Sequence, residues 1–188
     1  EMTSSLVGSE MCIRDRSCYD AVVSGTKYLI EQRIAHPGKI GLQGHSWSGF
    51  QTSFLVTKTD LFACANIGAP ITDMVTGYLG IRNGSGLPRY FMYEETQSRM
   101  GKTLWEAKDK YLANSAIVEA DKIHTPLLIW HNDKDEAVPY EQGRALYLAM
   151  RRLQRPAWHL NYKGEGHFLG NQAAQKLSLI HISEPTRL

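Results

Sequence analysis

A glycine-flanked serine between a short apolar strand and a helix is the feature of this chain that most constrains its fold. Residues 39–50 read KIGLQGHSWSGF, and a helical pattern continues from Phe50 to Val56. A serine at the tip of such a strand-to-helix turn stands clear of its backbone, where a base can reach its hydroxyl. We therefore predict a strand over residues 39–43, a helix over residues 48–57 and a nucleophile elbow at Ser46.

The residues around Ser46 fit the steric needs of such a turn. The positions two residues before and after the serine must be small because the turn brings them together. Gly44 meets this need, whereas Ser48 stands where glycine is usual, and Gly49 follows it. Ser48 is an alternative nucleophile but lacks a glycine two residues before it. The helix N-terminus points at Ser46, so we expect the backbone N–H of Trp47 to donate to an oxyanion. A chance match in an ordinary turn is the alternative.

A candidate acid lies in the loop that follows a second buried strand. Residues 126–130 form a continuous apolar run after Thr125, the pattern of a parallel strand buried on both faces. The polar loop at its carboxyl end contains Asp133 and Asp135. A carboxylate at a strand end can orient a histidine and stabilise its protonated form. Acids in such loops are also commonly solvated and without function.

A candidate base follows a third strand. Residues 157–162 predict this strand, and the glycine-flanked loop after it presents His167. The order Ser46, Asp135, His167 along the chain is the order used by α/β-hydrolases. A lone histidine is more often structural, so the prediction depends on three suitable residue types at three strand ends in one order.

We expect neither a metal nor a cofactor. Asp133 and Asp135 resemble part of a calcium loop, but no glycine occupies the sixth loop position. Four further histidines lack a coherent zinc-ligand spacing; they are His45, His124, His131 and His159.

Four segments together resemble the C-terminal catalytic domain of the prolyl oligopeptidase (S9) family of serine peptidases. They are Gly44 to Trp47, Arg99 to Glu106, His131 to Pro139 and Gly164 to His167. The resemblance covers residues 18 to about 174. It implies that Ser46 is the nucleophile, that Asp135 is the acid, as the first acid of an Asp-x-x-Val pattern, and that His167 is the general base.

The resemblance also implies the reaction and the partners. A peptide would be the substrate, and hydrolysis would pass through an acyl-enzyme on Ser46. In this family a β-propeller and further strands of the same sheet precede the segment seen here. Two alternatives remain: a carboxylesterase or other acyl hydrolase of the same fold, and a non-catalytic α/β-hydrolase-like module.

The predicted fold class is α/β, the C-terminal part of an α/β-hydrolase fold, with a mostly parallel sheet and helices on both faces. The expected helices span residues 18–35, 48–57, 104–114 and 140–153, and the expected strands span residues 39–43, 62–67, 126–130 and 157–162. Residues 1–16 and 177–188 resemble translated sequencing-adapter sequence. We therefore treat residues 17–176 as the genuine, partial catalytic domain of a longer protein.

Residues 68–102 are irregular and aromatic, as in loops that line a substrate cleft. Trp47, Tyr78, Tyr90 and Tyr93 are the candidate substrate contacts, and packing against another domain is the alternative for this segment.

Composition excludes some partners. The formal net charge is +2 and 43% of residues are hydrophobic, without a basic stripe or a membrane-length apolar run. We therefore expect no binding to nucleic acid or membranes. We expect Cys64, within the apolar run 61–67, to be buried and inert.

Overall fold

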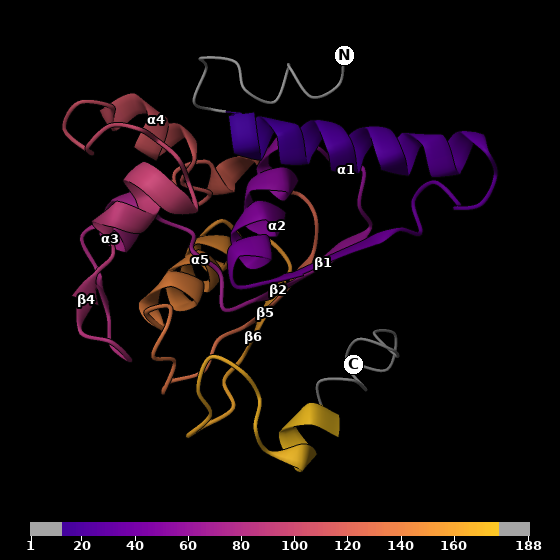
Figure 1. The fold of residues 1–188 in the computed structure, drawn as a ribbon. Coiled ribbons are helices and arrows are strands. Elements are labelled where there is room, and N and C mark those ends of the chain that lie inside the picture. The colour runs from indigo at the N-terminus through magenta and orange to yellow at the C-terminus, as the bar shows by residue number, and fades with distance from the viewer. Residues whose placement is uncertain (1–12, 177–188) are drawn as a thin grey trace.

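Four parallel strands form the sheet around which the chain is arranged (Figure 1). The computed structural model describes residues 13–176. The order across the sheet is β1 (Gly41–His45), β2 (Cys64–Gly68), β5 (Leu127–Trp130) and β6 (Ala157–Leu160). All three pairings are parallel, so the strands end at the same edge of the sheet. The predicted α/β class is confirmed.

Helices precede the first strand and separate the later ones, as the alternating pattern predicts. They are α1 (Ile13–Glu31), α2 (Trp47–Lys58), α3 (Met74–Tyr78), α4 (Lys108–Ala113) and α5 (Glu141–Arg152). A π-helical turn spans Met92–Thr96 and a 3-10 turn spans Ala120–Lys122. None of the helices within residues 13–176 is long and apolar enough to cross a bilayer.

The predicted adapter segments lie almost entirely outside the described residues. Residues 1–12 and 177–188 are not described. Helix α1 begins at Ile13 and so includes the last four residues of the segment 1–16. The adapter origin of both ends stays a prediction.

One face of the sheet packs against α2 and α5. Side chains alternate between faces along a strand, and the inward set is fully buried; it comprises Ala65, Ile67, Leu127, Ile129 and Ala157. Val56 of α2 and Leu146 and Met150 of α5 belong to the same cluster, as do Ala120 and Ile123.

The opposite face is less buried within residues 13–176. Gln43 and Cys64 are exposed there, and Trp158 is 51% exposed. The prediction that Cys64 is buried is wrong, because Ala65 takes the inward position in β2 and its neighbour in the strand must point outward.

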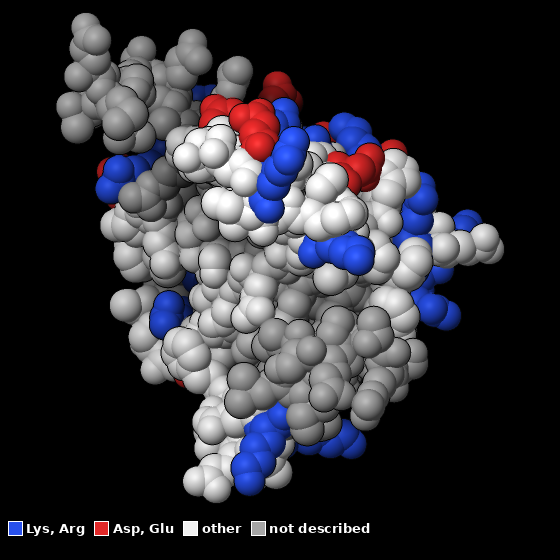
Figure 2. All heavy atoms as spheres, turned by 90° about the vertical axis from the view of Figure 1, so that its right-hand side faces the viewer, with Lys and Arg blue, Asp and Glu red and all other residues white. Residues whose placement is uncertain are grey.

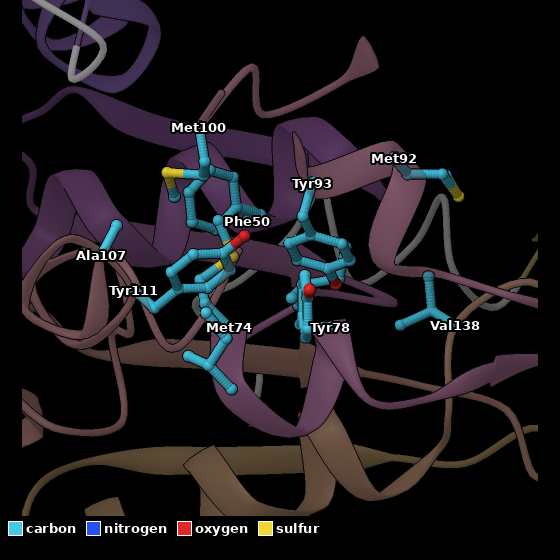
Figure 3. Close-up of a cluster of buried hydrophobic side chains, with 11 residues drawn as sticks. Phe50, Met74, Tyr78, Met92, Tyr93, Met100, Ala107, Tyr111 and Val138 are labelled. Carbon is cyan, nitrogen blue, oxygen red and sulfur yellow. The ribbon is translucent and has the colours of Figure 1, made fainter. Parts of the chain in front are cut away.

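The segment predicted to be irregular forms a second core. It contains α3, the π-helical turn and an antiparallel pair, β3 (Ile81–Arg82) with β4 (Leu87–Pro88). Its aromatic and methionine side chains pack around Phe50 of α2 (Figure 3). The segment therefore folds against the helix that begins at the elbow.

Candidate active site

Ser46 occupies a sharp turn between the last residue of β1 and the first residue of α2. Its φ of +59° is a left-handed value that few residues other than glycine adopt. A Cβ at Gly44 would lie 2.1 Å from the carbonyl oxygen of Ser48, so only glycine fits there. The backbone N–H of Ser46 donates to the carbonyl of Gly68 at 2.8 Å, which ties the turn to β2.

Ser48 braces this turn through its hydroxyl. The oxygen accepts the backbone N–H of His45 at 2.9 Å, and the hydroxyl donates to the carbonyl of His45 at 2.7 Å. Both contacts are with the backbone of the elbow, whereas the imidazole of His167 lies against Ser46. Ser48, which stands where glycine is usual, thus stabilises the turn by hydrogen bonding to the backbone of His45.

Three side chains from three strand ends meet above the sheet. The Nε2 atom of His167 lies 2.8 Å from the hydroxyl of Ser46, and its Nδ1 atom lies 2.8 Å from Oδ2 of Asp135. The carboxylate can only accept, so Nδ1 carries the proton and Nε2 accepts the serine hydroxyl. His167 and Asp135 are buried, at 5% and 6% exposure. The arrangement can move a proton from the serine to the imidazole.

Asp135 is held as an ionised acceptor. Its Oδ1 atom accepts the backbone N–H groups of Ala137 and Val138, each at 2.8 Å. Burial acts to raise the pKa of this carboxyl, but hydrogen bonds from His131, His167 and the backbone of Val138 outweigh it and hold the pKa well below its usual range. Asp135 therefore stays negatively charged beside His167 at neutral pH.

Asp133, the other acid considered from the sequence, has a different partner. Its Oδ1 atom accepts the backbone N–H of Gly164 at 2.8 Å. Asp133 therefore supports the loop that carries His167 and makes no contact with the imidazole.

Two side chains that the sequence did not single out hold the same loop. Asn132 is fully buried; its amide donates to the carbonyl of Gly166 at 2.7 Å and accepts the N–H of Tyr162 at 3.3 Å. Glu136 accepts the backbone N–H of His167 at 3.2 Å. The available signal was their place directly after a buried strand, where polar groups have to find partners.

His45, which precedes Ser46, links the elbow to the histidine loop. Its Nε2 atom lies 3.0 Å from the carbonyl oxygen of His167, and its ring stacks on Trp130 at 4.9 Å between centroids. Burial, together with the charge of His167, lowers the pKa of His45. The neutral ring donates to the carbonyl and packs against the imidazole of His167, 4.7 Å between centroids.

The expected oxyanion donor lies at the start of α2. Trp47 is the first residue of that helix, so its N–H has no partner in the helical ladder. The helix dipole adds partial positive charge at the same place. The half-buried indole of Trp47 packs against Phe50 and Tyr93.

The three tyrosines proposed as substrate contacts differ in exposure. Tyr78 and Tyr93 are buried within the second core (Figure 3), whereas Tyr90 is 48% exposed. Tyr78 donates to Glu94 at 2.5 Å, and burial and this carboxylate raise the pKa of Tyr78 to about 12. Tyr78 and Tyr93 therefore form part of the core. Of the four candidate substrate contacts, only Tyr90 and Trp47 have appreciable accessible surface.

Among residues 13–176, no three histidine, cysteine or acidic side chains group as metal ligands would. The described surface visible in Figure 2 shows lysine and arginine scattered around its edge, with acidic side chains near its top.

Comparisons with known proteins find the same family that the motifs resemble. The model of the prolyl oligopeptidase family matches residues 14–182. The uncharacterized peptidase YuxL of Bacillus subtilis (strain 168) is 26% identical over 153 residues, which cover 80% of this chain and 22% of that protein.

Two solved structures share the fold. A puromycin-hydrolysing peptidase of Mycobacterium tuberculosis superposes with a TM-score of 0.77 at 23% identity, covering 86% of this chain and 23% of that one. The acylaminoacyl peptidase of Pyrococcus horikoshii superposes with a TM-score of 0.74 at 18% identity, covering 95% and 29%. This chain thus spans between a fifth and a third of the length of these three proteins.

Proposed function

This chain belongs to the prolyl oligopeptidase family, and we propose that it is the catalytic part of a serine peptidase with Ser46, Asp135 and His167 as its triad. The observation that carries the proposal is the continuous chain of two 2.8 Å contacts through His167. It supplies a nucleophile, a base and an orienting carboxylate in one line.

In the proposed reaction, His167 takes the proton of Ser46 at Nε2 as the serine oxygen attacks the peptide carbonyl. The N–H of Trp47 stabilises the oxyanion. The C–N bond then breaks, and His167 passes the proton to the leaving amine, which leaves an ester on Ser46. Water attacks this ester with His167 again as base, and the ester bond breaks to restore the serine. Asp135 remains ionised and holds Nδ1–H throughout.

We further propose that residues 17–176 belong to a longer protein, called the parent below, whose upstream strands pair with β1. Within the described sheet β1 lies at an edge, and an unpaired edge is prone to association. A second oxyanion donor from an upstream segment is also expected. Losing one such donor typically costs about 10²–10³ in rate, so we expect this chain alone to be nearly inactive or to aggregate.

Fluorophosphonate labelling tests the proposed function. The parent should be labelled on Ser46, and S46A should abolish labelling, whereas S24A, in the exposed face of α1, should label like the wild type. A parent that stays unlabelled, or one that labels equally with S46A, contradicts the assignment. Turnover of peptide anilides rather than only of p-nitrophenyl esters separates a peptidase from an esterase.

A further inference from the structure

His131, the first residue after β5, is a fully buried imidazole whose tautomer is fixed by its surroundings. The backbone N–H of Gly143 points at its Nδ1 atom at 3.2 Å. Nδ1 must therefore be the acceptor, and Nε2 carries the proton of the neutral ring. A Cβ at position 143 would lie 2.6 Å from Nδ1, so the start of α5 leaves room for this ring by using glycine.

The Nε2–H group of His131 faces the loop that carries the triad acid. It lies 3.1 Å from the carbonyl oxygen of Val138 and 3.3 Å from Oδ2 of Asp135. The same Oδ2 atom is the one that faces Nδ1 of His167. One carboxylate oxygen therefore lies between two imidazoles, and both the carboxylate and the His131 ring are shielded from water.

We propose that His131 is a positioning residue that acts on His167 through Asp135; the inference rests on the proposed function. By donating between Val138 and Asp135, the ring fixes the loop and the direction of Oδ2. By sharing Oδ2 with His167, it also limits how strongly the carboxylate stabilises the protonated base. A hydrogen bond from a buried donor to a charged acceptor is stronger where water is excluded.

Two titratable side chains contact Asp135, each from a different strand end: His131 after β5 and His167 after β6. His45, at the end of β1, is a third imidazole of the site and packs against the ring of His167. The carboxylate of Glu136, next in the chain, is turned to the backbone N–H of His167. Removing the donor of His131 leaves His167 as the only imidazole in contact with Oδ2.

Two substitutions in the parent separate the two nitrogen atoms of His131. In H131N the amide reaches only about as far as Nδ1, so it can accept from Gly143 but cannot donate to Asp135. In H131Q the amide nitrogen reaches about the place of Nε2 and can donate. H159Q is the matched control, since His159 lies on the neighbouring strand and its Nε2 atom has no hydrogen-bond partner within residues 13–176.

The readout is the rate of fluorophosphonate labelling against pH, with the melting temperature measured in parallel. H131N should label about 10- to 100-fold more slowly at neutral pH, and the acidic limb of its profile should move to higher pH, because the carboxylate then holds the protonated base more strongly. H131Q should stay within about threefold of the wild type, and H159Q should match it.

The inference is overturned if H131N labels at the wild-type rate, if its rate falls with an unchanged pH profile, or if H131Q and H131N lose rate equally. If H131N does not fold, H131Q decides: a wild-type rate and profile support the inference, and a loss overturns it. Failure of the wild-type parent to label would instead contradict the proposed function, so the two failures are distinct.

Discussion

The imidazole of His167 lies 2.8 Å from the hydroxyl of Ser46, although 121 positions separate the two residues in the sequence. The contact exists because β1 and β6 are parallel strands of one sheet, whose carboxyl ends share an edge. Ser46 follows β1 directly, and the loop after β6 returns His167 over it. The topology of the sheet therefore brings the two groups together.

The structure distinguishes the two acids of the loop after β5, and this leads to the first prediction. D135N should lower the labelling rate and the turnover of the parent by about 10³–10⁴, because an amide cannot hold the Nδ1–H tautomer of His167. D133N removes only a support for Gly164 and should cost less than about tenfold. The measurement is the labelling rate of both variants at the same pH and temperature. A larger loss of rate in D133N than in D135N would mean that Asp133 is the triad acid.

The alternation of strands and helices could be predicted because apolar periodicity is a local property. Helix 48–57 differs from α2 by one residue at each end, and the strand over residues 126–130 coincides with β5 to within one residue. The first strand was predicted two residues too early. Its bounds depend on pairing with Cys64–Gly68, a distant segment that a local pattern does not reveal.

Side-chain partners could be predicted less well. The order of Ser46, Asp135 and His167 indicated a shared site, since strand ends of a parallel sheet meet at one edge. The buried donors His131 and Asn132 gave no comparable signal, because their roles depend on contacts with residues far along the chain. The same dependence on tertiary packing explains why two tyrosines of segment 68–102 lie in the core.

The elbow glycine leads to a prediction about stability. G44A would place a Cβ 2.1 Å from a backbone oxygen of Ser48 and 2.4 Å from the hydroxyl of Thr52. Such overlap cannot relax without opening the turn, so we expect a loss of at least about 3 kcal/mol in the free energy of unfolding. Urea unfolding of the parent, monitored by circular dichroism, measures this loss.

The control for this substitution is G25A in α1, where nothing lies within 4 Å of the added Cβ. Alanine favours helix over glycine, so the free energy of unfolding should rise by up to about 1 kcal/mol. A G44A variant as stable as G25A would show that the turn is looser than its contacts indicate.

The buried hydroxyl of Tyr93 leads to a third prediction. Among the described residues it makes no hydrogen bond of standard geometry, and the side chain that interacts with it is the buried Arg89. Y93F should therefore leave the free energy of unfolding within about 0.5 kcal/mol of the wild type. In Y111F a hydroxyl that donates to the carbonyl of Lys102 at 3.1 Å is lost, and we expect a loss of about 1 kcal/mol. Both values come from the same unfolding titration.

Y93F also tests the expected substrate contact. If the hydroxyl of Tyr93 binds substrate, KM of the parent should rise in Y93F while the free energy of unfolding does not fall. An unchanged KM would leave Tyr93 as a residue of the second core only.

The low pKa of Asp135 predicts how stability depends on pH. The folded-state pKa lies below that of the unfolded chain, about 3.9, so the ionised carboxylate favours the folded state. This contribution is fully present above about pH 5 and is lost progressively as the pH falls toward the folded-state value.

The melting temperature of D135N should therefore lie below that of the wild type at pH 7, and the difference between the two melting temperatures should narrow below about pH 5. A difference for D135N that stays constant from pH 7 to pH 3 would mean that the hydrogen bonds to Asp135 do not stabilise its charge in the folded protein.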